Sequence, residues 1–189
     1  MRYRFPIPAL ASAAALWFAA PAACQELALD LDPTRTTVQF KLEATLHTVH
    51  GSFKVQRGAI RIDPATGKIA GEVVVDAGSG ESGNAGRDRR MHEGVLESAR
   101  YREIVFAPDH VEGAVAAQGV SHVQVHGILR LHGAAHEITV PVRVQIAGGQ
   151  LTAAAHFAVP YVKWGLKNPS SLLLHVSDKV EIDVTVYTR

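Results

Sequence analysis

Apolar and polar residues alternate with a period of two along most of the chain, most regularly in residues 119–149. Apolar side chains occupy odd positions in the first half of this stretch and even positions in the second half, and the parity changes at residues 133–135. Successive side chains of a strand point to opposite faces, so the pattern predicts a β-hairpin with one apolar face. The register that we expect pairs Leu131 with Ile138, Leu129 with Val140, and Val125 with Val144.

Six further segments show the same alternation and are separated by turns rich in glycine and proline. In the second of them the parity switches between Val55 and Ile60, which predicts a β-bulge at Gly58. Together with the hairpin, these segments predict about eight short antiparallel strands. The six segments are residues 29–44, 51–62, 69–75, 104–106, 151–159 and 180–186.

Residues 77–100 form the one long break in this alternation. Glycines at its start are followed by Met91, Val95 and Leu96, which recur at helical spacing. We predict a short helix over residues 86–98, connected loosely because glycine is entropically expensive to order. We expect the whole segment to border the mouth of the β structure rather than to join its wall.

Short strands with alternating faces are typical of a sandwich or a closed barrel, and closure removes exposed strand edges. We therefore predict an all-β fold, an antiparallel β-barrel of about eight strands with one short helix. Its inward residues are mostly small, so they either leave room for an apolar ligand or pack against one another. The residues that we expect to line the lumen and contact a ligand are Val38, Phe40, Leu42, Val73, Val75, Phe106, Val123, Val125, Leu129, Val142, Val144, Phe157 and Trp164.

The first 24 residues have the layout of a secretory signal peptide, with Arg2 and Arg4 before an apolar run and small residues at its end. We expect cleavage at this boundary and a single domain over residues 25–189. Cys24 is the only cysteine, so the domain folds without an internal disulfide. Lipidation of Cys24 is the alternative, although the residues before it lack the leucine that is usual in lipoprotein signals.

Removing the two arginines of the signal leaves 17 Lys and Arg against 18 Asp and Glu. A chain this close to neutral offers no broad basic surface for nucleic acid. The 47% hydrophobic content is that of a globular protein with a sizeable core.

Four motifs, FKLEATLHTVHGSF, RDRRMHEGVLESARYREIVFAP, VHGILRLHGAAHEITVPV and VEIDVTV, follow one another in this order after the signal peptide. In this combination the chain resembles the YceI-like family of exported bacterial proteins. The resemblance implies a lipocalin-like barrel in the periplasm that encloses an apolar chain such as a polyisoprenoid, an isoprenoid quinone or a fatty amide. It implies no catalytic residues and no cofactor.

The family's Arg-Asp pair at the start of the helix corresponds to Arg87-Asp88, and Arg35-Thr36 stands where many members carry His-Ser. The resemblance to one subgroup implies a lid or rim over residues 161–170. From the charge run itself we consider Arg87, Arg89 and Arg90 as contacts for a polar head of the ligand, with plain solvent exposure as the alternative.

Ten histidines raise the question of a metal site. His122 and His126 are four residues apart on a strand, about 13 Å at ~3.3 Å per residue, which is too far to chelate one ion. His132 and His136 flank a turn and could meet, but we expect them to be exposed on a solvated polar face. We therefore predict no metal.

No enzyme motif is present either. The GSGESGN stretch lacks the last glycine of a nucleophile elbow, and neither His-Glu pair continues into a zinc-binding HExxH motif. The chain is thus expected to be a carrier of an apolar ligand rather than an enzyme. The alternative is a scaffold or interaction protein with a self-filled barrel, associated with a membrane b-type cytochrome; transient membrane contact and a homodimer are left open.

Overall fold

The computed structural model describes residues 27–63, 66–171 and 174–189. The expected signal peptide, residues 1–24, lies outside the described residues. The described chain forms nine strands and one short helix that continues into a π-helical turn. The strands are β1 Leu27–Asp30, β2 Thr37–Glu43, β3 Thr48–Asp63, β4 Lys68–Glu81, β5 Glu103–Glu112, β6 Gly119–Leu131, β7 Ala134–Ala147, β8 Gln150–Val159 and β9 Val180–Tyr187, and the helical elements are α1 Ala85–Arg90 and the π-helical turn Met91–Val95.

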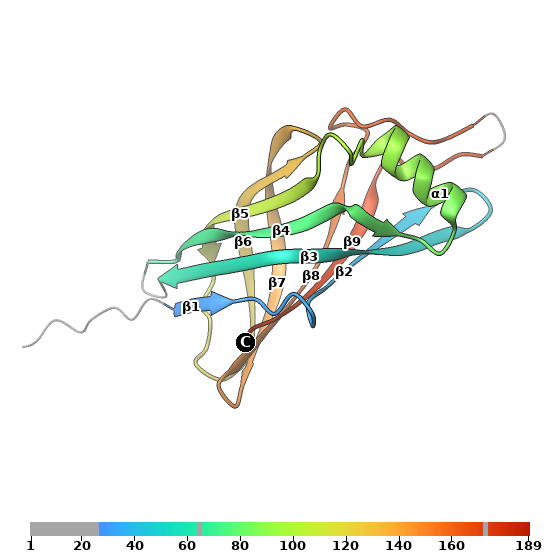
Figure 1. Cartoon of the computed structure of the whole chain (residues 1–189). Helices are drawn as coiled ribbons and strands as arrows, with labels where there is room; N and C mark the ends of the chain where they lie inside the picture. The colour runs from blue at the N-terminus through green and yellow to red at the C-terminus, as the bar shows by residue number, and fades with distance from the viewer. Residues whose placement is uncertain (1–26, 64–65, 172–173) are drawn as a thin grey trace, which may run out of the picture.

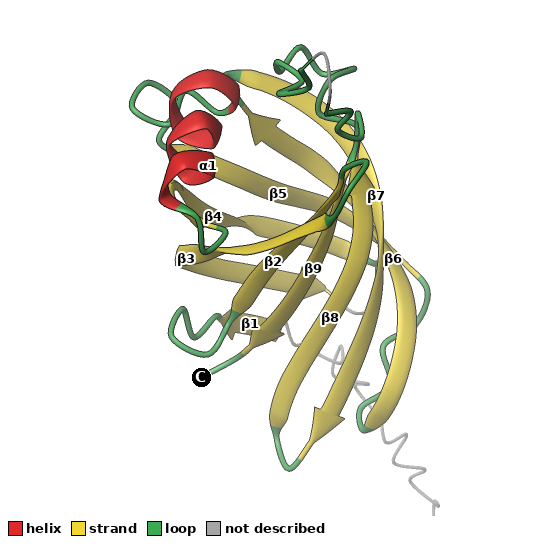
Figure 2. Cartoon of the chain, turned by 90° about the vertical axis from the view of Figure 1, so that its right-hand side faces the viewer, coloured by secondary structure: helices red, strands yellow, loops and turns green. Residues whose placement is uncertain are grey.

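Eight of the strands close into an antiparallel barrel (Figures 1 and 2). Neighbouring strands follow the order β3-β2-β9-β8-β7-β6-β5-β4, and the pairing of β3 with β4 closes the ring. Helix α1 lies at one end of the barrel, which we call the helix end, and the opposite one is the far end (Figure 2). The predicted all-β barrel with one short helix is confirmed.

The first predicted strand is divided in two. Both β1 and β2 pair with β3, one after the other along its length, and the chain turns away between them at residues 31–36. The buried side chain of Leu31 lies over Gly58, where an added Cβ would stand 2.6 Å from Leu31 Cδ2. The bulge that we predicted at Gly58 lies elsewhere. The register of β3 against β4 shifts just before Gly58, between Val55 and Arg57.

The central hairpin forms, but the predicted register is wrong by four residues. Leu131 lies opposite Ala134, and Val125 lies opposite Val140. The two turn residues, His132 and Gly133, have φ angles of 53° and 76°, as a tight two-residue hairpin requires. Because the error is an even number of residues, every side chain still points to the predicted face.

Residues 77–100 depart from the prediction in two respects. The helix predicted over residues 86–98 is α-helical only to Arg90 and ends as a π-helical turn at Val95. The glycine-rich part up to Glu81 is not a loose connection, because it belongs to β4 and joins the wall, where Glu81 pairs with Ser52 of β3. The helix begins at Ala85, with the Asn84 side chain accepting a hydrogen bond from the Arg87 N–H at 3.0 Å. Such an N-cap satisfies a donor that the first helical turn leaves free.

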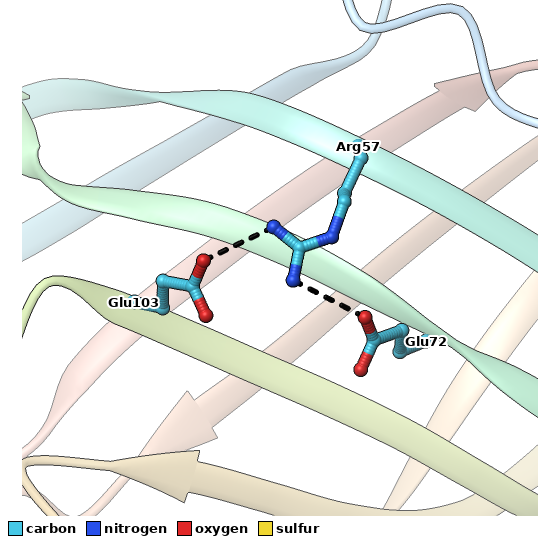
Figure 3. Close-up of polar contacts among 3 residues, drawn as sticks. All are labelled: Arg57, Glu72 and Glu103. Carbon is cyan, nitrogen blue, oxygen red and sulfur yellow. Dashed lines mark hydrogen bonds and ion pairs between the residues drawn. The ribbon is translucent and has the colours of Figure 1, made fainter.

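On the outer surface, one arginine links the three neighbouring strands β3, β4 and β5. Arg57 of β3 extends across β4 and donates to Glu103 of β5 at 3.0 Å and to Glu72 of β4 at 3.3 Å (Figure 3). Val74 is the cross-strand neighbour of Arg57. Its sequence neighbours on both sides line the lumen, so the strand alternation places Val74 on the outer face, yet it is completely buried. The aliphatic stem of an arginine can cover apolar surface in this way while its charged group stays in water.

The apolar interior consists of two clusters, one toward each end of the barrel. The cluster toward the far end includes Leu31, Ile60 and Leu151, and the cluster at the helix end includes Leu129 and Tyr161. Between them, side chains from all nine strands line one interior.

Candidate ligand-binding cavity

A cavity of about 1090 Å³ occupies the barrel interior. All nine strands, α1 and the π-helical turn contribute side chains to its wall. Sites for small molecules usually measure ~300–1,000 Å³, so this volume suits a ligand at the upper end of that range or a long chain. The small inward side chains leave the lumen open, and a self-filled barrel does not form.

Twelve of the thirteen residues that we expected to contact a ligand lie on this wall. Trp164 does not line the cavity, contrary to our expectation. Its ring instead stacks on His136 of β7, with ring centroids 4.0 Å apart and planes inclined by only 3°. The twelve are Val38, Phe40, Leu42, Val73, Val75, Phe106, Val123, Val125, Leu129, Val142, Val144 and Phe157.

Many wall residues were absent from the expected set. Some of them, such as Val49 and Ile60, follow the strand alternation and could have been included from it. Others, such as Tyr161 and Leu166, come from the irregular segment after β8, where no period marks the inward face. Both are buried, with 5% and 4% of their surfaces exposed.

Helix α1 and the π-helical turn are fastened to β4 by His92. Its Nε2 lies 2.8 Å from the Gly80 carbonyl oxygen and its Nδ1 lies 3.1 Å from the Ser98 hydroxyl. Since a carbonyl only accepts, Nε2 carries the proton and Nδ1 accepts from the hydroxyl. Gly80 also leaves room for Phe53 and Met91, each of which an added Cβ would approach within 2.7 Å.

The three arginines of the helix differ in their surroundings, although all of them line the cavity. Arg87 donates from Nε to the Ser82 hydroxyl and from Nη2 to the Ser82 carbonyl, both at 2.7 Å. The Asp88 carboxylate accepts from the Ser82 backbone N–H at 2.9 Å and from the Ser82 hydroxyl. The Arg87-Asp88 pair thus holds the connection between β4 and the helix in place.

The wall is incomplete between β7 and β8. Their ladder ends at Val142 and Ala155, and within residues 134–159, all of them described, no pairing between the two strands continues toward the helix end. The next residue of β7 is Pro141, which has no N–H to donate. We call this interrupted part of the wall the seam.

Residues 160–166 lie against the seam. Trp164 stacks on His136 of β7, and Tyr161 packs with Leu129 and Leu131 of β6. Burial raises the pKa of Tyr161 to about 12, and its hydroxyl donates to the Ser177 carbonyl at 2.7 Å. Side chains therefore complete the wall where the backbone ladder stops.

The family follows from a comparison over almost the whole described chain. A family model for the YceI-like domain matches residues 29–188. The chain belongs to the YceI-like family. No curated protein sequence matches it.

Solved structures of similar fold include one named as a YCEI protein and one named as a polyisoprenoid binding domain. BcnA of Burkholderia cenocepacia superposes with a TM-score of 0.70 at 19% identity, over 85% of this chain and 100% of that one. A polyisoprenoid binding domain from Saccharophagus degradans, implicated in plant cell wall breakdown, gives 0.64 at 18% identity, over 84% and 97%. The YCEI protein of Campylobacter jejuni gives 0.63 at 18% identity, over 76% and 86%. At these identities the likeness shows the lipocalin-like fold of YceI proteins.

His126, His132 and His136 of this YceI-like chain each contact a different partner. His132 and His136 are partly buried rather than exposed, because His132 packs against Tyr101 with centroids 4.4 Å apart and His136 stacks on Trp164. His126 is paired with Asp109 at 2.7 Å, and this hydrogen bond raises the pKa of His126. Within the described ranges, no three His, Cys, Asp or Glu side chains are grouped closely enough to hold a metal ion.

The helical content of this YceI-like chain is small. In the part of the chain that the structure describes, no helix is long and apolar enough to cross a membrane.

Proposed function

We propose that this protein is a carrier that encloses an apolar chain ligand, such as a polyisoprenoid, an isoprenoid quinone or a fatty amide, in the barrel lumen. The observation that carries the proposal is the cavity of about 1090 Å³ lined almost wholly by aliphatic and aromatic side chains. The fold shared with the polyisoprenoid binding domain of Saccharophagus degradans supports it.

The energetics suit a long ligand. Burial of one CH₂ group contributes ~0.8 kcal/mol, so a chain of a few dozen carbons offers more free energy than a binding equilibrium retains after ordering costs. Such binding depends on the area buried and little on the identity of the chain. We therefore expect tight binding with weak selectivity for length.

The alternative function is a scaffold whose barrel is filled by its own side chains. That function needs a packed lumen, since protein interiors are close-packed with few voids larger than a water molecule. A cavity of this volume counts against it.

Three consecutive alanines of β8 provide the test. Ala153 and Ala155 line the cavity, whereas Ala154 lies on the outer face beside Arg143 and Thr185. An Ala155→Trp variant should lose most of the apolar ligand that purifies with the wild-type protein, because the indole occupies the lumen. Ala154→Trp adds the same side chain outside and should keep the full load.

The measurement is native mass spectrometry, followed by solvent extraction and identification of the released molecule, on protein from its own host. A cooperative thermal unfolding transition of each variant serves as the check that both are folded. Equal loads in the two variants, or a wild-type protein that neither carries an apolar molecule nor takes up added polyprenol, would contradict the carrier function.

We propose further that the carrier works in the periplasm after removal of residues 1–24. The charged start, apolar run and small residues before Cys24 support export. The intact mass of protein from the periplasmic fraction should correspond to a chain that begins between Ala23 and Gln25. A mass that retains Arg2 would refute cleavage, and an added diacylglyceryl group on Cys24 would make the protein a lipoprotein.

A further inference from the structure

The charges on the cavity wall are confined to one place. Among the described residues that line it, only Arg87, Arg89 and Arg90 carry a fixed charge, and no aspartate or glutamate is among them. All three lie on α1, at the helix end of the barrel (Figure 2). The cavity is therefore an apolar chamber with a single cationic end.

Two of these arginines have no partner among the described residues. Arg87 is held by Ser82, as described above. Arg89 and Arg90, in contrast, form no hydrogen bond or ion pair with any residue in the ranges 27–63, 66–171 and 174–189. Both side chains are exposed, so their guanidinium groups are free to move toward a ligand.

The nearby carboxylates leave this charge uncompensated at the cavity. Asp88 accepts two hydrogen bonds from Ser82 and does not line the wall. Glu81 and Glu93 are exposed and are also absent from the wall. Low-dielectric walls focus the field of unpaired charges, so the helix end attracts anions.

We propose that the ligand carries an oxyanion head of the phosphate type, bound by Arg89 and Arg90, while its apolar chain fills the lumen. This inference rests on the carrier function proposed above. The planar guanidinium group matches a phosphate with two parallel N–H donors, and such charge-assisted hydrogen bonds are about twice as strong as neutral ones. Arg87 keeps the helix in place and does not bind the head.

The test compares two ligands with one chain and different heads, hexadecyl phosphate and hexadecanol. Each competes with a fluorescent fatty probe for the lumen. Wild-type protein should bind the phosphate ten- to a hundredfold more tightly. The Arg89→Gln, Arg90→Gln double variant should lose this preference and keep its affinity for hexadecanol within about twofold. The preference should also decrease as salt is added, because the arginines are exposed.

A second double variant, Arg130→Gln, Arg143→Gln, is the matched control. It removes the same charge from the outer faces of β6 and β7, where both arginines are exposed, and should keep the wild-type preference. Loss of preference in both double variants would mean that net charge is responsible and would overturn the proposal.

The remaining outcomes separate this inference from the carrier function. If wild-type protein binds both ligands equally, the head site is wrong and the carrier function stands; if neither ligand displaces the probe, the carrier function fails as well. Inorganic phosphate alone should compete poorly, and competition at similar concentrations would indicate a free-anion site instead. If the Arg89 and Arg90 changes reduce pelleting with phosphatidylglycerol vesicles but not the hexadecyl phosphate preference, the arginines contact membrane headgroups and the proposal is overturned.

Discussion

A Val144→Asp variant is expected to be destabilised by roughly 3–5 kcal/mol and to purify without ligand. Val144 lies in the second half of β7, is buried with 7% of its surface exposed, and lies opposite Ser121 and Ala153. A carboxylate there has no cationic partner on the described part of the wall, because the fixed charges that this part carries are at the helix end. In a 150–250-residue protein 1 kcal/mol corresponds to about 2–4 °C, so the melting temperature should decrease by roughly 6–20 °C.

The adjacent Gln145→Asp variant is the control. Gln145 is exposed on the outer face of the same strand, opposite Val120 and Thr152, and the same aspartate there should change stability by less than about 0.5 kcal/mol. The Val144→Asp protein should regain part of its stability near pH 4, where the carboxyl group becomes neutral. A folded Val144→Asp variant with wild-type melting temperature and a full load would show that Val144 does not face the bound ligand.

Removal of the ligand should lower the melting temperature of the wild-type protein by about 10 °C. A ligand that binds only the folded state adds roughly 3–4 kcal/mol at 100 to 1,000 times its Kd. The same conversion of about 2–4 °C per kcal/mol then gives the expected shift. The measurement is calorimetry on solvent-extracted protein before and after addition of a polyprenol, with extraction verified by mass spectrometry.

The Ala155→Trp variant is the control for this experiment, since its lumen is partly filled. Its melting temperature should respond little to the same additions. A wild-type protein that unfolds at one temperature with and without ligand would mean that the lumen neither holds the ligand nor depends on it.

The strand alternation predicted the barrel and most of its wall because it reports directly which face each side chain occupies. It predicted the central hairpin on the correct face but in the wrong register, since registers that differ by an even number of residues bury the same side chains. The turn decides between them, and His132-Gly133 with its two positive φ angles selects the tight two-residue connection. The helical spacing of Met91, Val95 and Leu96 likewise predicted a helix in the segment that contains α1 and the π-helical turn.

Features without a period could not be predicted in this way. Trp164 and Tyr161 come from one irregular segment, yet one stacks outside the cavity on His136 and the other faces the lumen. The charge run also makes Arg87 and Arg89 equal candidates for contact with a ligand. Only the structure shows that Arg87 is already hydrogen-bonded to Ser82. Such distinctions depend on contacts between residues that no local pattern connects.

The seam has a consequence for behaviour at high protein concentration. Along residues 134–141, all of them described, the side of β7 that faces β8 offers backbone groups with no strand partner, which is the surface that another chain would extend into an intermolecular sheet. Trp164 on His136, together with Pro141 and the charged Glu137, blocks that edge. The segment at residues 160–166 thus protects the protein from edge-to-edge aggregation, a protection that a barrel with an unbroken ladder would not need.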